Sequence, residues 1–323
     1  MNGTPRRAIL GAALAAAGAR AAGAEQPPSP FAPPSSRPRP MTLLVGAAGG
    51  SAPDRWVRGF APFLERHLRR VQISVGNRVS LGGLGVLREL ADGPADGSVL
   101  GYVATPAVLA RMVEANEVDL LGRLRLLGTV AEEPIVLVAA QGTDIAALRA
   151  ERDRPLALPP VTSASAQAAV AAGDALPLAH LHFPSAAAAR LATVAGNAAA
   201  AMLSLPDALP ALREGKLGAI GVASGARSVL LPDVPTLTEA GLPLIASLQR
   251  GFLAPAGMPE GRVAAIMDAL RKAVADPEFA AQTEAWGTTP RALTAREWGE
   301  VVATDLAALR YRWESSPWTA TRG

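Results

Sequence analysis

The sequence predicts an α/β fold built on a largely parallel sheet. From Met41 onward, short apolar runs alternate with stretches of helical periodicity, which is the pattern of α/β proteins. The chain has 323 residues, of which half are apolar and few are aromatic, so it can fill two cores with Ala-rich helices. Length, composition and alternation together favour two α/β domains.

The first half of the chain contains five apolar runs typical of strands. They span 41–47, 71–75, 98–104, 124–130 and 134–140. Amphipathic segments at 54–70 and 84–93 separate the first three runs, and the second segment stops at Gly93 and Pro94. This βαβαβ order predicts parallel strands joined by right-handed crossovers.

The second half gives clear signals only towards its end. Residues 186–203 mix helix and strand signals, so we assign no element there. The segments TLTE at 236–239 and TARE at 294–297 each predict a capping box. Residues 259–277 form an apolar helical stripe, and a last helix is expected to follow the second capping box.

The N-terminus has the pattern of a secretory signal. Arg6 and Arg7 precede a short apolar stretch, and small residues at 22–24 supply a cleavage pattern before Glu25. We therefore predict a signal peptide over 1–24 and export to the periplasm. The arginine pair also resembles a twin-arginine signal, which leaves the export route open, and an ordinary Ala-rich helix is the alternative.

Charge and cysteine content exclude several classes. The formal net charge is +3, but Arg6, Arg7 and Arg20 lie in the predicted signal, which has no acid, so the rest of the chain is formally neutral. This balance gives no support for nucleic-acid binding. The absence of cysteine excludes disulfides and thiolate chemistry. The Pro/Ser-rich residues 25–40 predict an extended linker.

The segment VGAAGGSAPDRWVR at 45–58 is the first candidate for binding. A strand, a Gly-Gly turn and a helix start present free backbone N–H groups at a positive helix end, which suits a carboxylate or phosphate. Gly49 and Gly50 let a ligand approach the main chain because no Cβ intervenes. Asp54 has two interpretations: it caps the helix in a box with Ser51, or it contacts the ligand.

No pattern in the sequence predicts catalysis or metal binding. His180 and His182 alternate along one predicted strand face, but no third ligand is evident nearby, so we expect exposed strand residues. Motifs for hydrolases, metalloproteases and paired carboxylates are absent. We predict no catalytic residue, no metal and no cofactor.

Four ordered segments resemble the Bug family, the periplasmic solute-binding proteins of tripartite tricarboxylate transporters. They lie at 46–68, 75–106, 211–243 and 251–259, and the resemblance covers roughly 41–318. RSVLLPDVPTLTEAGLP is the most specific motif, followed by GGSAPD and GNRVSLGG. The resemblance implies a two-lobed, type II periplasmic-binding (Venus-flytrap) fold, with one lobe at 41–135 plus 223–323 and the other at 136–222.

The resemblance also implies a small organic carboxylate held between the lobes by main-chain amides of the Gly-Gly loop and by loops of the other lobe. In this family the Asp after the first loop can face the distal group of the ligand. The candidate ligand-binding residues are Ala48, Gly49, Gly50, Ser51, Asp54, Thr105, Thr162, Ser163, Ser165, Pro184, Ser185 and Ser204.

This chain departs from the family pattern in its loops. Ala47 and Ala48 replace the usual Pro region before the glycine pair, Pro184 begins an atypical second-lobe loop, and Asn197 replaces a common acid. These departures predict a pocket that is more apolar or roomier than usual.

We expect a monomeric, non-enzymatic receptor that closes on its ligand and presents it to a membrane permease. The alternatives are an orphan or sensory binding protein without a permease and, more distantly, a periplasmic enzyme on the same scaffold.

Overall fold

The computed structural model describes residues 38–79, 81–315 and 317–318. The signal peptide predicted over 1–24 and most of the linker predicted over 25–40 lie outside these residues. Strand β1 begins at Arg39, so the last two residues of the predicted linker belong to the sheet.

The described residues form one ten-stranded mixed sheet with the order β2-β1-β3-β9-β4-β7-β5-β6, and β8 and β10 also pair with β4. β1 is parallel to β2 and β3, and β7, β5 and β6 are parallel to one another. The antiparallel strands β9 and β4 connect these two sets. The strands are β1 (Arg39–Val45), β2 (Val71–Asn77), β3 (Val99–Thr105), β4 (Leu124–Ala139), β5 (Leu156–Leu158), β6 (His180–His182), β7 (Ala200–Ser204), β8 (Gly218–Val222), β9 (Ser247–Pro255) and β10 (Thr289–Pro290).

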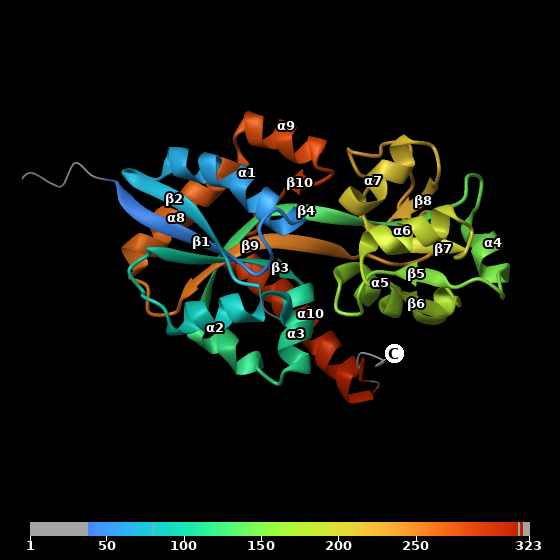
Figure 1. Ribbon diagram of the computed structural model, residues 1–323, viewed down its shortest axis with the longest axis horizontal. Coiled ribbons are helices and arrows are strands. Elements are labelled where there is room, and N and C mark those ends of the chain that lie inside the picture. Colours follow the sequence, from blue (N-terminus) through green and yellow to red (C-terminus); the bar gives the residue numbers. More distant parts are fainter. Residues whose placement is uncertain (1–37, 80, 316, 319–323) are drawn as a thin grey trace, which may run out of the picture. The chain divides into compact units, whose positions relative to one another are not determined.

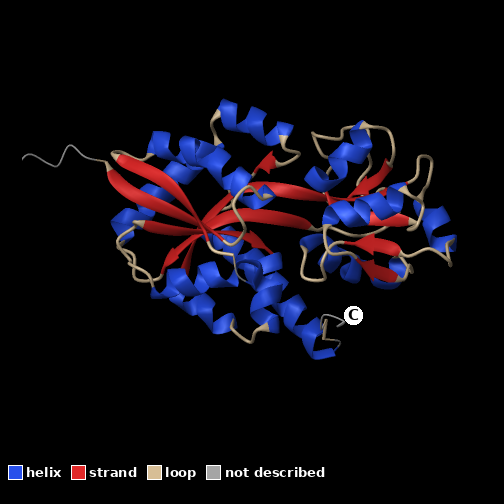
Figure 2. Ribbon diagram, in the orientation of Figure 1, coloured by secondary structure: helices blue, strands red, loops and turns tan. Residues whose placement is uncertain are grey.

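Helices cover the sheet on both sides (Figures 1 and 2). The α-helices are α1 (Ala52–His67), α2 (Leu84–Asp92), α3 (Ala107–Glu114), α4 (Ile145–Ala150), α5 (Ala164–Ala172), α6 (Ala186–Val194), α7 (Leu205–Arg213), α8 (Glu260–Val274), α9 (Pro277–Ala285) and α10 (Ala295–Ser315). Short 3₁₀ turns occupy η1 (Leu81–Gly83), η2 (Val118–Arg123) and η3 (Gly173–Ala175). Among the described residues, no helix combines the length and the apolar character needed to cross a bilayer.

The prediction of separate strands at 124–130 and 134–140 is wrong, because both belong to the single sixteen-residue strand β4. β4 pairs with β9 up to Pro134 and with β7 and β8 from Ile135 onward. Pro134 has no N–H to donate, but it lies opposite Ser247, the first residue of β9, where the pairing changes partner. The strand therefore continues through the proline.

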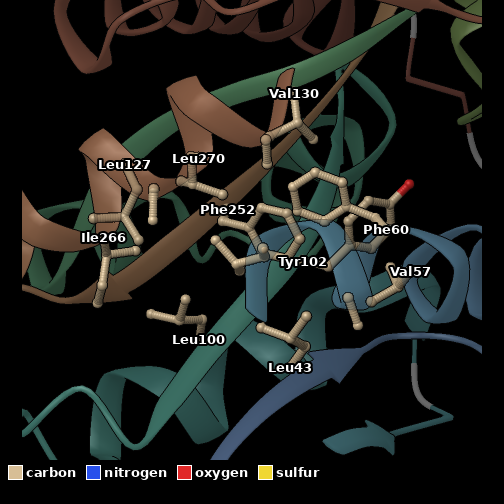
Figure 3. Close-up of a cluster of buried hydrophobic side chains, with 14 of the residues drawn as sticks. Leu43, Val57, Phe60, Leu100, Tyr102, Leu127, Val130, Phe252, Ile266 and Leu270 are labelled. Atoms are coloured by element: carbon tan, nitrogen blue, oxygen red, sulfur yellow. The ribbon is translucent and has the colours of Figure 1, made fainter. Parts of the chain in front are cut away.

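Four buried clusters lie on the two faces of the sheet. Around β1, β3 and β9, helices α1, α8 and α9 cover one face and α2, α3 and α10 cover the other (Figure 1). Figure 3 shows the first of these clusters, in which Phe60, Tyr102 and Phe252 pack together. In the second half of β4, Ile135 and Leu137 face one cluster while Val136 faces the other, as the strand period requires.

Several local predictions are confirmed. Thr236 and Glu239 exchange both hydrogen bonds of a capping box, and Thr294 and Glu297 do the same before α10. The ambiguous segment 186–203 resolves into helix α6 and strand β7. The predicted division of the chain into lobes at 41–135 plus 223–323 and 136–222 stays a prediction.

Candidate functional site

The Gly-Gly loop joins β1 to α1 and lies open to solvent. Ala48, Gly49 and Gly50 are exposed, and Ser51 is half-buried. Gly50 has a φ of 76°, a left-handed conformation that favours glycine, and a Cβ built on it would meet no atom within 4 Å. A ligand can therefore approach the main chain at Gly50 without obstruction.

Asp54 is turned back onto this loop. Its carboxylate accepts the Gly50 N–H at 2.7 Å, the Asn77 amide at 2.8 Å and the Arg58 Nε–H at 3.0 Å, and Asp54 is only 2% exposed. The Arg58 hydrogen bond, followed by those from Gly50 and Asn77, lowers the pKa of this carboxyl to about 2. Both carboxylate oxygens therefore already accept hydrogen bonds from the protein. This favours a role in which Asp54 positions the Gly-Gly loop and does not contact the ligand.

The predicted box between Ser51 and Asp54 takes a different form. Ser51 is the N-cap of α1, but its hydroxyl caps no backbone N–H, and Asp54 accepts from Gly50 and not from Ser51. The Ser51 hydroxyl oxygen is buried and finds no partner within the described part of the chain. The loop is thus fixed through Gly50, one residue earlier than the box pattern predicts.

Gly46 fixes the other end of the loop, a role that the sequence did not reveal. A Cβ on Gly46 would lie 2.3 Å from the Cα of Gly83, so the backbones of the β1 end and the α2 start are in direct contact. This contact leaves no room for a side chain at Gly46.

Two further helix starts contain the candidate ligand-binding residues at 162–165 and 184–185. Ser163 caps α5 by accepting the Ala166 N–H at 3.2 Å, and Ser185 caps α6 by accepting the Ala188 N–H at 3.1 Å. Neither helix has an acid in its first turn. The positive ends of both dipoles are therefore not offset, in contrast to α1 with Asp54.

The remaining candidates differ in their surroundings. Thr162 and Ser165 are buried beside the Ser163 cap, and Pro184 is half-buried before Ser185. The hydroxyl oxygen of Thr105 is buried and accepts the Trp298 indole N–H at 3.2 Å.

Ser204 donates its hydroxyl hydrogen to Asp207 at 2.8 Å. The hydroxyls of Thr105 and Ser204 are thus already engaged by other side chains.

A cavity of about 770 Å³ lies where α3 and α10 meet the segments that follow β5 and β6. We call it the arginine cavity; its lining residues are Arg111, Glu114, Pro160, Val161, Gln167, Val170, His182, Phe183, Pro184, Arg312, Ser315, Pro317 and Trp318. Of the predicted site residues only Pro184 lines it, although Val161 and Phe183 directly precede the segments that start α5 and α6. Arg111, Gln167 and Arg312 were missed because nothing local in the sequence connects them.

A second cavity, of about 240 Å³, is lined by residues that include Trp56, Glu133, Asp207 and Arg250. Arg250 and Glu133 form a buried ion pair, and the Arg250 guanidinium lies 5.0 Å from the Trp56 ring centroid. Burial raises the pKa of the Asp207 carboxyl despite its hydrogen bond from Ser204. The sequence signal that could have found the ion pair is a charge inside an apolar strand: Arg250 is the one charged residue of β9, and Glu133 follows Glu132 in the middle of β4.

His180 and His182 lie exposed on β6, as expected. The His182 Nδ1 atom is 3.0 Å from the Pro159 carbonyl oxygen. Within the described residues, no group of three or more His, Cys, Asp or Glu side chains is placed to hold a metal ion.

Comparison with known families gives the decisive observation. Residues 64–309 match the model of the tripartite tricarboxylate transporter family receptor, TctC. The chain belongs to this family. It is a family of transport receptors, and the predicted resemblance is confirmed.

Solved structures agree on the fold. A TctC solute-binding protein from Polaromonas superposes with a TM-score of 0.73 at 21% identity, covering 87% of this chain and 99% of that one. MatC from Rhodopseudomonas palustris with bound malate superposes with a TM-score of 0.69 at 23% identity, covering 84% of this chain and 98% of that one. An R. palustris protein with adipate gives 0.71 at 20% identity, covering 86% and 95%. This receptor therefore has the predicted two-lobed periplasmic-binding fold. No curated protein matches the sequence.

Proposed function

We propose that this TctC-family receptor captures a small organic carboxylate in the periplasm and presents it to a tripartite tricarboxylate-type permease. The main support from the structure is the pair of helix starts at α5 and α6. Each is capped by a serine and keeps an unopposed positive dipole, and the residues just before both helices line a cavity that also contains two arginines. These groups suit an anionic ligand group such as a carboxylate.

Family and relatives support the same ligand class. The matching family is that of tripartite tricarboxylate transporter receptors, and two structural relatives were solved with malate and adipate. The basic, apolar and small-residue pattern of residues 1–24 supports export. The ligand, by contacting both lobes, would favour the closed form through its additional contacts there.

A thermal-shift screen tests the proposal. The protein beginning at Glu25 is unfolded, freed of any bound ligand by dialysis, refolded and heated with a panel of organic acids that includes malate and adipate. A ligand that binds only the folded state adds RT ln(1 + [L]/Kd), which is about 2.7 kcal/mol at a hundredfold excess over Kd. We expect at least one acid to raise the melting temperature. A refolded protein that responds to no acid contradicts the proposal.

The Gly50→Val variant tests the place of binding. No residue of the Gly-Gly loop lines the arginine cavity. If the ligand also contacts this loop when the lobes close, the branched side chain would occupy its place, and binding of the active acid should be lost while the circular dichroism spectrum stays that of a folded protein. Wild-type affinity in a folded Gly50→Val variant would mean that the ligand does not contact this loop.

A further inference from the structure

The arginine cavity is larger than a short diacid requires. Its volume of about 770 Å³ lies within the ~300–1,000 Å³ range of sites for drug-sized ligands. Water occupies ~30 Å³ per molecule in the liquid, so a four-carbon acid would leave most of this space filled with solvent. A ligand with a larger body fits the cavity better.

One wall of the cavity is apolar. Val161, Val170 and Phe183 contribute to it, and Val170 is 39% exposed although it lies on a helix whose other apolar residues are mostly buried. Apolar surface that borders a cavity gains free energy when a ligand covers it, at about 25 cal/mol per Å². The wall therefore favours a ligand with an aromatic or branched hydrocarbon body.

The polar side chains of the cavity favour a single anionic group. The lining contains two arginines, Arg111 and Arg312, and one acidic residue, Glu114. The Nη1 of Arg111 lies 2.6 Å from the carboxylate of Glu114, so these two form an ion pair. Arg312 donates from Nη1 to the Gln167 carbonyl oxygen at 3.2 Å. The lining thus retains one positive charge, that of Arg312, beyond its internal ion pair.

Two of the arginines that line this cavity have a buried donor without an acceptor. The Nε–H groups of Arg111 and Arg312 find no acceptor among the described residues, but both Nε atoms are covered by protein and do not face the cavity. Burial also lowers the pKa of Arg312, and Asp305 opposes that shift only in part. The guanidinium group of Arg312, which lines the cavity, is therefore incompletely paired within the protein, and an anion bound there would add an acceptor. A carboxylate accepts from such donors more strongly than a neutral oxygen does.

We propose that the arginine cavity selects a bulky monocarboxylate, one carboxylate on an aromatic or branched apolar body, and that Arg312 determines this selectivity by binding the carboxylate. The inference rests on the proposed function and narrows its ligand class. It sets this receptor apart from a binder of short diacids.

Calorimetry on the refolded protein tests the inference with 2-naphthoate, its uncharged analogue 2-naphthamide, malate and adipate. We expect 2-naphthoate to bind at least about tenfold more tightly than the other three. Arg312→Met should weaken 2-naphthoate binding by about tenfold or more. Arg310→Met is the matched control, because Arg310 is exposed on the same helix and lies outside the cavity.

A second variant covers the case in which Arg312→Met fails to fold. Val170→Phe adds bulk to the exposed apolar wall of the cavity, so it should weaken 2-naphthoate and leave the shorter acids unaffected.

The outcomes separate the two proposals. If no acid binds, the proposed function fails and this inference fails with it. If malate or adipate binds as tightly as 2-naphthoate, or if neither Arg312→Met nor Val170→Phe weakens 2-naphthoate, only this inference is overturned.

Discussion

Replacing Asp54 should loosen the Gly-Gly loop and weaken binding of every carboxylate alike. The buried carboxylate accepts hydrogen bonds from Gly50, Asn77 and Arg58. Asp54→Ala removes both acceptor oxygens, and Asp54→Asn removes one of them together with the negative charge. Arg58 has a half-exposed side chain and regains water, which limits its contribution to less than ~1 kcal/mol. An unsatisfied partner that is fully buried costs ~1–3 kcal/mol, but Gly50 is exposed and Asn77 is half-buried, so water can replace part of what these two donors lose.

The expected loss of unfolding free energy for Asp54→Ala is therefore about 1–2 kcal/mol, which corresponds to roughly 2–8 °C in melting temperature for a domain of this size. Urea unfolding followed by circular dichroism measures it. Asp174→Asn is the control, because Asp174 is exposed in a short turn. A loss below about 0.5 kcal/mol would show that Asp54 does not anchor the loop.

The pH dependence has a defined sign. The pKa of Asp54 falls from 3.8 to about 2 on folding, so its ionised form stabilises the native state fully above about pH 4, and the stabilisation is lost as the pH falls through 2. The stability difference between wild type and Asp54→Asn should therefore shrink between pH 4 and pH 2. A constant difference over this range would contradict the assignment of the shift to Asp54.

Binding assays separate the two roles of Asp54. If Asp54 only positions the loop, Asp54→Asn should weaken malate and succinate by the same factor, because the two acids differ only in a hydroxyl group. If Asp54 contacts the distal part of the ligand, as the family resemblance implies, malate should lose more affinity than succinate. Equal losses would support the positioning role.

Three further substitutions test the packing. Gly46→Ala should destabilise the protein by about 1–3 kcal/mol in urea unfolding, because its Cβ would overlap the backbone of Gly83. Arg250→Met should cost about 3–5 kcal/mol in the same assay by leaving Glu133 buried without its partner, and adding Glu133→Gln should restore part of the loss. Burial raises the pKa of Asp305 to about 6. Ionising this carboxyl therefore destabilises the folded state progressively as the pH rises from about 4 through 6. Asp305→Asn should raise the melting temperature at pH 7 but not at pH 4, where the carboxyl is still protonated in the folded state.

Each of these has a contradicting result. Gly261→Ala is the control for Gly46→Ala, since a Cβ at position 261 meets no neighbour within 4 Å. If the two substitutions destabilise the protein equally, the loss at Gly46 does not come from the overlap of its Cβ with Gly83. If the double variant Arg250→Met with Glu133→Gln is less stable than Arg250→Met alone, the loss of stability is not caused by an unpaired charge on Glu133. An Asp305→Asn variant with the same pH profile as wild type would mean that Asp305 does not titrate near pH 6.

Local patterns in the sequence predicted most of the regular structure. The alternation of apolar runs located β1, β2 and β3, and the capping boxes at Thr236 and Thr294 form as expected. The prediction failed at Pro134. A proline interrupts a strand only where the neighbouring strand would accept a hydrogen bond from that position. The neighbour of Pro134 is Ser247, more than a hundred positions later in the chain, so the sequence around Pro134 does not reveal it.

The site was predictable only where it consists of consecutive residues. The start of α1 was predicted from a short motif. Helices α5 and α6 were not predicted, although Ser163 and Ser185 were named as candidate site residues and cap these helices as their residue type favours. The direction of the Asp54 side chain depends on Asn77, and the arginine cavity depends on a contact between Arg312 and Gln167, which lie 145 residues apart. Such contacts are set by tertiary packing, and no local spacing encodes them.

The three helix starts differ in charge, and the difference bears on where an anion is held. At α1 the Asp54 carboxylate occupies the Gly50 N–H and offsets the positive end of the dipole, so this loop offers a ligand close backbone approach but little positive potential. At α5 and α6 the caps are neutral serines, and Arg312 adds a full positive charge beside α5 through its contact with Gln167. A carboxylate therefore gains more from the α5 and α6 side, and no residue of the Gly-Gly loop lines the arginine cavity. Arg312→Met should accordingly weaken the acids and leave their amides unaffected. Gly50→Val should exclude acids and amides alike if the ligand also contacts the Gly-Gly loop, and should change neither if it does not.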